Sequence, residues 1–146
     1  MDHNTLLLIH FVSTAVMTGL IWVVQLVHYP SFYFIEDKKF INFEKFHKNR
    51  ISLIVLPFMV LEVLTGVMLI YLHEETYSRA NFISGLIILL IIWIVTFGFS
   101  MRMHQKLEKG MDTKAIHLLI ATNWIRTIGW SLRLALLILF SKISIS

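Results

Sequence analysis

Three charged residues stand inside long apolar stretches of the sequence: Glu62, Arg126 and Arg133. If these stretches cross a membrane, each charge costs about 2.5–3.5 kcal/mol on insertion scales unless it is paired. We therefore expect Glu62 to pair with one of the two arginines, either as a structural pair that fixes helix register or with Glu62 carrying protons. The arginine that remains predicts a binding site for an anionic group, such as a carboxylate or a haem propionate.

Histidine is the other residue type here that could hold a cofactor. His10 lies in the apolar run LLLIHF, where a histidine is either satisfied by a neighbouring hydroxyl or carboxylate or serves as an axial haem ligand. His28, His47 and His104 fall near one end of their predicted helices, and imidazole suits Zn, Cu and Fe. Histidines at a membrane surface also bind headgroups and water. A haem site at His10 and a metal site at the other three are therefore hypotheses.

Polar side chains recur at steps of three or four residues within the apolar stretches, which places them on one helix face. The first stretch carries His10, Thr14, Thr18, Trp22, Gln25 and His28, and the last carries Asn123, Arg126, Thr127, Trp130 and Arg133. Such stripes predict a helical bundle with a polar interior. The residues that we expect to bind a cofactor there are His10, Trp22, Glu62, Arg126, Trp130 and Arg133.

The composition indicates a membrane protein. Of the 146 residues, 57% are apolar and only 15% are charged, and the mean hydropathy is +0.74, a balance that water-soluble domains do not show. There is no cysteine, which excludes disulfides, thiolate metal ligands and cysteine nucleophiles. The net charge of +4 comes from short connections beside apolar stretches, so membrane lipid is the expected partner and nucleic acid is not.

Four stretches have the roughly 20 residues that a helix needs to cross a bilayer core. They cover about residues 5–28, 50–72, 81–103 and 115–140, and the turn EKGMD follows the third. The connection 31–49 alternates aromatic and charged residues, which predicts a short interfacial helix at the membrane surface. Residues 1–146 are thus predicted to form a single all-α domain, an integral membrane four-helix bundle.

Lysine and arginine are unevenly distributed between the two ends of these helices. One end has nine of them: Lys38, Lys39, Lys45, Lys48, Arg50, Arg102, Lys106, Lys109 and Lys114. The other end has only Arg79 and Lys142. Short loops rich in lysine and arginine stay in the cytoplasm. We therefore predict that the connections after the first and third stretches are cytoplasmic and that both termini lie on the outer side.

Two resemblances follow from these motifs. The segments LIHFVSTAVMTGLIWVVQLVHYPSF, FEKFHKNRISLIVLPFMVLEVLTG and TNWIRTIGWSLR resemble a group of uncharacterised small bacterial four-span membrane proteins. More remotely, the first three helices resemble those of HemJ-type protoporphyrinogen oxidases. The residues that carry the second resemblance are His10, Gly19, Arg50, Pro57, Met59, Lys106, Leu107 and Gly110.

These resemblances imply a multi-pass protein of the bacterial inner membrane, and the second implies haem b bound through His10. The sequence also departs from the oxidase pattern. The family's lysine in the third helix has no counterpart between Asn81 and Met101, its PRLFVYH ending is replaced by VQLVHYP, and its fourth helix lacks the arginines found here. We therefore carry over the fold and the haem site, but not the oxidase activity.

Three functions fit these features. The first, which we favour, is a membrane protein that holds haem or a metal ion in a polar bundle interior and takes part in redox chemistry. The second is a cofactor-free binder or transporter of a small anionic or amphipathic molecule. The third is a structural subunit of a membrane complex, in which the polar stripes join helices to one another. Carriers usually contain two repeated halves, so a chain of this length would need a second copy to act as one, and a homo-oligomer is left open. Enzymatic activity is also left open.

Overall fold

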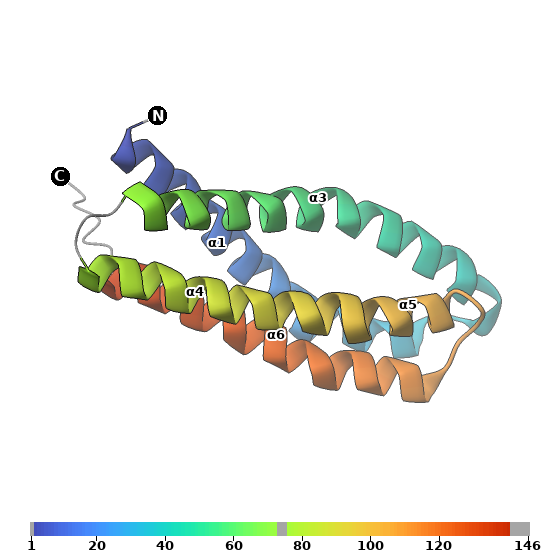
Figure 1. The fold of residues 1–146 in the computed structure, drawn as a ribbon. Coiled ribbons are helices and arrows are strands. Elements are labelled where there is room, and N and C mark those ends of the chain that lie inside the picture. Colours follow the sequence, from blue (N-terminus) through green and yellow to red (C-terminus); the bar gives the residue numbers. More distant parts are fainter. Residues whose placement is uncertain (1, 73–75, 141–146) are drawn as a thin grey trace.

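The chain folds into four helical arms that form an all-α four-helix bundle, as predicted (Figure 1). The computed structural model describes residues 2–72 and 76–140, so Lys142 lies outside the described residues. The arms consist of α1 (His3–Val23), the π-helical segment η1 (Val24–His28), α2 (Tyr29–Ser31) and the 3-10 segment η2 (Phe32–Phe34); α3 (Asp37–Leu72); α4 (Thr76–Val95), the π-helical segment η3 (Thr96–Ser100) and α5 (Met101–Leu107); and α6 (Thr113–Phe140).

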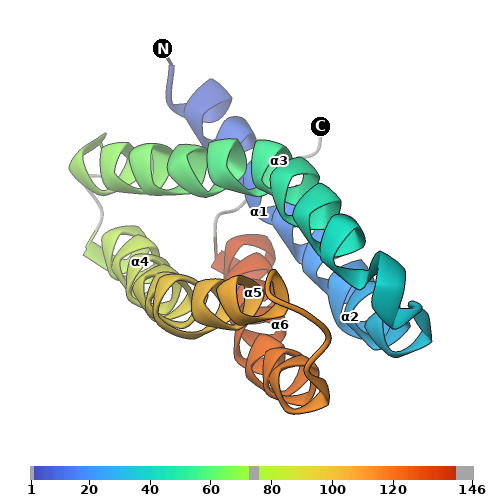
Figure 2. The same cartoon turned by 90° about the vertical axis from the view of Figure 1, so that its right-hand side faces the viewer.

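Each arm packs on two neighbours, so the four arms surround one interior. α1 contacts α3 and α6, and α4 contacts the same two helices. α1 begins and α6 ends at the same end of the bundle, which we call the terminal end (Figure 1). The opposite end, which faces the viewer in Figure 2, holds the connections 35–36 and 108–112 with their neighbouring lysines. We call it the basic end.

Three of the arms are long and apolar enough to cross a membrane: His3–Phe34, Asp37–Leu72 and Arg79–Leu107. They expose many large apolar side chains, such as Leu53 and Leu90, whereas soluble proteins rarely expose apolar surface of this extent. α6 has a similar length, but polar residues such as Asn123 and Arg126 lower its hydropathy, and it is not among the three. These features indicate a multi-pass membrane protein.

α3 is longer than the span predicted from hydropathy. It runs without interruption from Asp37 to Leu72, 36 residues or about 54 Å, which exceeds a bilayer core of about 30 Å. A short interfacial helix was predicted within residues 31–49; in the structure residues 37–49 are helical and continue without a break into the membrane-length part of α3. No glycine or proline interrupts residues 37–56, and Phe40 and Glu44 bury their side chains in the bundle.

A tight turn fixes where α6 begins and so sets the height of its polar residues. Gly110 has a φ of 148°, which other residues rarely adopt, and the predicted turn EKGMD is confirmed. Asp112 then accepts a hydrogen bond from the backbone N–H of Ala115 at 2.9 Å, as an N-cap residue does. The hydrogen bond from Lys106, followed by that from Ala115, lowers the pKa of the Asp112 carboxyl, which keeps the cap ionised at neutral pH.

Candidate functional site

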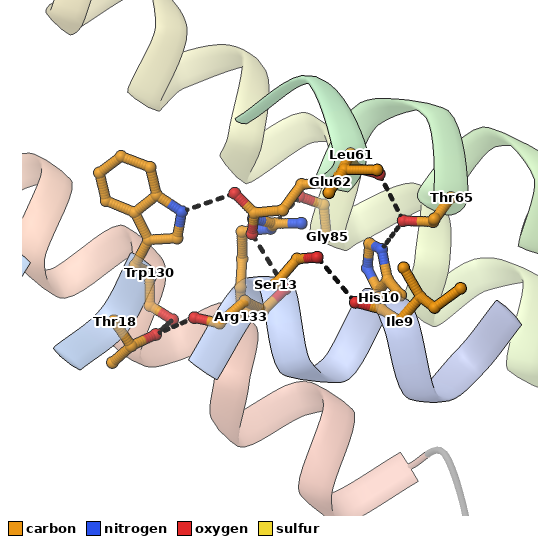
Figure 3. Close-up of polar contacts among 11 residues, drawn as sticks. Ile9, His10, Ser13, Thr18, Leu61, Glu62, Thr65, Gly85, Trp130 and Arg133 are labelled. Atoms are coloured by element: carbon orange, nitrogen blue, oxygen red, sulfur yellow. Dashed lines mark hydrogen bonds and ion pairs between the residues drawn. The ribbon is translucent and has the colours of Figure 1, made fainter. Parts of the chain in front are cut away.

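Glu62 is the centre of a polar cluster in the middle of the bundle, which we call the Glu62 cluster (Thr14, Glu62, Trp130 and Arg133). Arg133 Nη1 forms an ion pair with Glu62 Oε1, and Trp130 Nε1 donates to Oε2 at 3.0 Å (Figure 3). The Thr14 hydroxyl donates to Oε1 at 2.9 Å. Glu62 is 0% and Arg133 2% exposed. Both carboxylate oxygens therefore have partners in a fully buried setting.

Arg133 is matched both in charge and in hydrogen bonds. Its Nε donates to the backbone carbonyl of Gly85 at 3.0 Å, which adds α4 to the helices joined by this cluster. Glu62 was expected to pair with one of two arginines, and its partner is Arg133. The ion pair therefore fixes the relative height of α3 and α6, while Arg126, about two helical turns nearer the basic end, is left to other partners.

His10 makes a separate polar contact nearer the terminal end. Its Nδ1 lies 2.7 Å from Thr65 Oγ1, and the same hydroxyl donates its only proton to the Leu61 carbonyl at 2.6 Å (Figure 3). The threonine oxygen therefore accepts from His10, so Nδ1 carries the proton and Nε2 keeps a lone pair. The ring is closely packed: a Cβ added to Gly66 would lie 3.2 Å from His10 Cε1, and Phe82 meets the ring edge-on.

Arg126 belongs to a different polar cluster, between the Glu62 cluster and the basic end. Its Nη2 donates to Tyr29 Oη at 3.0 Å and also to Asn123 Oδ1, and both acceptors are neutral. Within residues 2–72 and 76–140 no carboxylate forms an ion pair with Arg126, and its buried Nε has no hydrogen-bond partner. Since the side chain is 6% exposed, Arg126 is a buried guanidinium with an unused donor.

Tyr29 links Arg126 to a histidine and a carboxylate. A guanidinium can only donate, so Tyr29 Oη accepts from Arg126 and directs its own proton to His104 Nε2, 3.2 Å away. His104 Nδ1 lies 2.5 Å from Glu44 Oε1, and Glu44 is fully buried. The result is a buried chain of hydrogen bonds that runs from α6 through α2 and α5 to α3.

The three histidines predicted as metal ligands lie together at the basic end. The ring centroids of His28 and His47 are 3.9 Å apart, and those of His47 and His104 are 5.6 Å apart. In the part of the chain that the structure describes, however, no group of three or more His, Cys, Asp or Glu side chains is arranged to hold a metal ion. The metal site at these histidines stays a prediction.

A cavity of about 260 Å³ lies beside Arg126. Its polar lining consists of Tyr29, Lys48, Ser52, Thr96, Ser100, His104, Gln105, Arg126 and Trp130. Its apolar lining consists of Met17, Leu20, Ile21, Val24, Ile51, Val55, Leu56, Phe97 and Met101. Both π-helical segments border the cavity, η1 through Val24 and η3 through Thr96, Phe97 and Ser100. Such segments are rare and occur frequently at functional sites, which makes this cavity the candidate site.

The two tryptophans predicted to surround a ligand have different environments. Trp130 is fully buried and lines the cavity. Trp22 lies on the outside of the bundle, where its ring meets Trp124 edge-on at 5.8 Å and its Nε1 donates to Ser131 at 3.0 Å. It is 38% exposed and does not line the cavity. Of this pair, only Trp130 can therefore contact a molecule bound beside Arg126.

In the hydrogen-bond chain that starts at Arg126, Tyr29 and Glu44 are the two residues that reasoning from the sequence missed. Tyr29 directly follows His28 and was not counted among the polar stripes. Glu44 fell in the segment expected to lie at the membrane surface. A signal for Glu44 was present, since Glu44 and His47 have an ExxH spacing that places both on one face of a helix. In the structure that face points into the bundle, because both side chains are buried.

The described part of the bundle interior thus holds a closed ion pair, Glu62 with Arg133, and an open cationic site at Arg126. Glu62 and Arg133 satisfy each other, whereas Arg126 presents an unused donor beside a cavity. A guanidinium in this setting suits the carboxylate, phosphate or sulfonate group of a bound molecule. Comparison of the chain with protein-family models, with curated proteins and with solved structures finds no match.

Proposed function

We propose that this protein binds a small anionic amphiphile within the membrane, in the cavity beside Arg126. All four arms then cross a bacterial inner membrane, with the basic end in the cytoplasm and both termini outside. The excess of lysine and arginine at the basic end supports this orientation. The observation that carries the binding proposal is Arg126 itself, which is buried, lines the cavity and forms no ion pair with the described carboxylates.

The desolvation of Arg126 supports a bound anion. Removing a guanidinium from water costs several kcal/mol unless charges and hydrogen bonds replace the lost hydration. The hydroxyl of Tyr29 and the amide of Asn123 replace only part of it, since Nε has no partner among the described residues. An anionic group in the cavity supplies both the missing charge and the missing acceptor. A purely structural role, in which the arginine only joins helices, explains neither the free Nε nor the cavity beside it.

The shape and lining of the cavity define the kind of ligand. Half of the lining side chains are apolar, and the polar ones include the cation Arg126, so the ligand combines an anionic group with an apolar part. At about 260 Å³ the cavity is slightly smaller than the range of about 300–1,000 Å³ for drug-sized ligands. The ligand is therefore small, or only its anionic end and the first part of its chain lie inside.

Isothermal titration calorimetry of the protein in lipid nanodiscs tests this proposal. The probe is octyl sulfonate, which is permanently ionised, and octanol serves as the uncharged molecule with the same chain. We expect saturable binding of octyl sulfonate, beyond its partition into empty nanodiscs, and none of octanol. Arg126→Gln should weaken the affinity about tenfold to a hundredfold, because hydrogen bonds to a charged group contribute about 1.5–3 kcal/mol.

The matched control for this measurement is Arg102→Gln. Arg102 is an exposed arginine of α5 that does not line the cavity, so its loss removes the same charge without changing the site. We expect the affinity of this variant to equal that of the unmodified protein. An equal loss of affinity in both variants would show that anions are attracted to the basic end in general. An absence of saturable binding heat in the unmodified protein would overturn the proposed binding function.

Haem b at His10 is tested separately by the absorption spectrum of the purified protein. The lone pair on His10 Nε2 favours haem, because an imidazole nitrogen is the axial ligand. The packing opposes it: His10 does not line the cavity beside Arg126, and both Gly66 and Phe82 pack against its ring. We expect no Soret band, oxidised or dithionite-reduced. A Soret band that is lost in His10→Ala would restore the haem hypothesis.

A further inference from the structure

The cavity beside Arg126 has apolar side chains at its edge that are also exposed on the outside of the bundle. Leu56 of α3 is 47% exposed, Phe97 of η3 is 42% exposed and Met101 of α5 is 44% exposed, and all three line the cavity. A side chain that both lines a cavity and is exposed lies at its opening. The cavity therefore opens sideways, between α3 and the segment formed by η3 and α5.

Gln105, which is also exposed and lines the cavity, lies at the part of the opening nearest the basic end, whereas the part nearer the terminal end has apolar surroundings. Both edges of the opening belong to arms that are long and apolar enough to cross a membrane, and these arms run along one face of the bundle (Figure 1). Leu53, one turn from Leu56, is 69% exposed, and Phe99, close to Met101, is 55% exposed. An ion without an apolar part would be poorly solvated on this path. A molecule that reaches Arg126 through the opening must therefore carry an apolar chain.

Building on the proposed binding function, we propose that the ligand is a single-chain anionic amphiphile that enters sideways from the surrounding lipid leaflet, between α3 and η3–α5. Its anionic group reaches Arg126, and its chain passes Leu56 and Phe97 into the lipid. The small volume of the cavity supports this arrangement, because about 260 Å³ holds the anionic group and only part of a long chain. The opening lets the rest of the chain remain in the membrane.

Charge supports an anionic rather than a zwitterionic ligand. Lys48 lines the cavity toward the basic end, where it is paired with Glu108 of the connection 108–112, and Arg126 lies deeper. The basic end also carries most of the lysine and arginine of the chain, which attracts anionic amphiphiles to the adjacent leaflet. An anionic group therefore meets positive charge both at the membrane surface and inside the cavity.

Labelled cysteines test where the chain of the ligand lies, in a sequence that has no cysteine of its own. Leu56→Cys places a bimane label at the opening, and Leu53→Cys places it on the same helix at an exposed site outside the cavity lining. The probe is dodecyl sulfonate brominated within its chain, because bromine quenches the label on contact. We expect saturable quenching at position 56, reversed by excess octyl sulfonate, and only gradual quenching at position 53.

The opposite edge of the opening provides a second pair of positions, Met101→Cys at the edge and Phe99→Cys as its exposed control. Saturable quenching at an edge position that disappears with Arg126→Gln would support lateral access. Saturable binding by calorimetry combined with gradual quenching at all four positions would overturn lateral access and leave the binding function intact. The absence of binding in both measurements would overturn the two proposals together.

Discussion

Replacing Glu62 by alanine is expected to lower the free energy of unfolding by about 3–5 kcal/mol, because it leaves a buried arginine without its counter-charge. The arginine is Arg133, which is 2% exposed, so bulk solvent does not reach it to replace the carboxylate. The same substitution removes the acceptor of the Thr14 hydroxyl and of Trp130 Nε1. Unfolding by titration with sodium dodecyl sulfate in mixed micelles, followed by circular dichroism, measures the loss.

The double variant Glu62→Leu with Arg133→Met serves as the control. Replacing a whole buried ion pair by apolar residues of similar volume is often neutral or stabilising. We therefore expect the double variant to recover most of the stability that Glu62→Ala loses. If Glu62→Ala unfolds at the same detergent fraction as the unmodified protein, the ion pair does not hold α3 and α6 together, and a role of Glu62 in proton transfer gains weight.

Arg126→Met and Arg133→Met are expected to have opposite consequences, although they are the same substitution on the same helix. Arg133→Met leaves Glu62 buried and unpaired, so the free energy of unfolding should fall by about 3–5 kcal/mol. Arg126→Met removes a buried charge that has no ion pair with the described carboxylates. Its two hydrogen bonds have a charged donor and contribute about 1.5–3 kcal/mol each, which the relief of a desolvation cost of several kcal/mol offsets.

The expected result for Arg126→Met is therefore an unfolding free energy close to that of the unmodified protein, together with loss of octyl sulfonate binding. The same detergent titration and the same calorimetry measure both quantities. A loss of stability as large as that of Arg133→Met would show that Arg126 is a structural residue of the bundle. In that case Arg126 would not be available to bind an anionic ligand in the cavity.

The bundle was predictable because the main evidence for it, the length of the apolar stretches, does not depend on tertiary contacts. Four helical arms, the turn at Gly110 and an ion pair between Glu62 and an arginine all follow from local pattern or from the cost of a buried charge. The start of α3 could not be predicted in this way, because hydropathy identifies the apolar part of a helix and not its full length. Residues 37–49 are polar enough to be assigned to the membrane surface, yet they are helical and continuous with the rest of α3.

The site was predicted less completely than the fold. Arg126 was identified as one of two candidates for a free cation, but the choice between Arg126 and Arg133 depends on the relative height of α3 and α6, which no local signal fixes. Tyr29 is apolar in most of its surface, so its hydroxyl did not mark it as part of a polar cluster. The π-helical segments were not predicted either, since each is a single wider turn inside a helix whose apolar pattern continues through it.

The wider turn of η3 determines which way the end of the third arm faces. In a regular α-helix each residue rotates the side chain by about 100°, so three steps of four residues, from Ile92 to His104, drift by about 120° around the axis. Ile92, Ser100 and His104 are nevertheless all buried on the interior side. The π-helical segment between them cancels this angular drift. A single inserted or deleted residue in Thr96–Ser100 would therefore rotate His104 away from Tyr29 and open the basic end of the cavity.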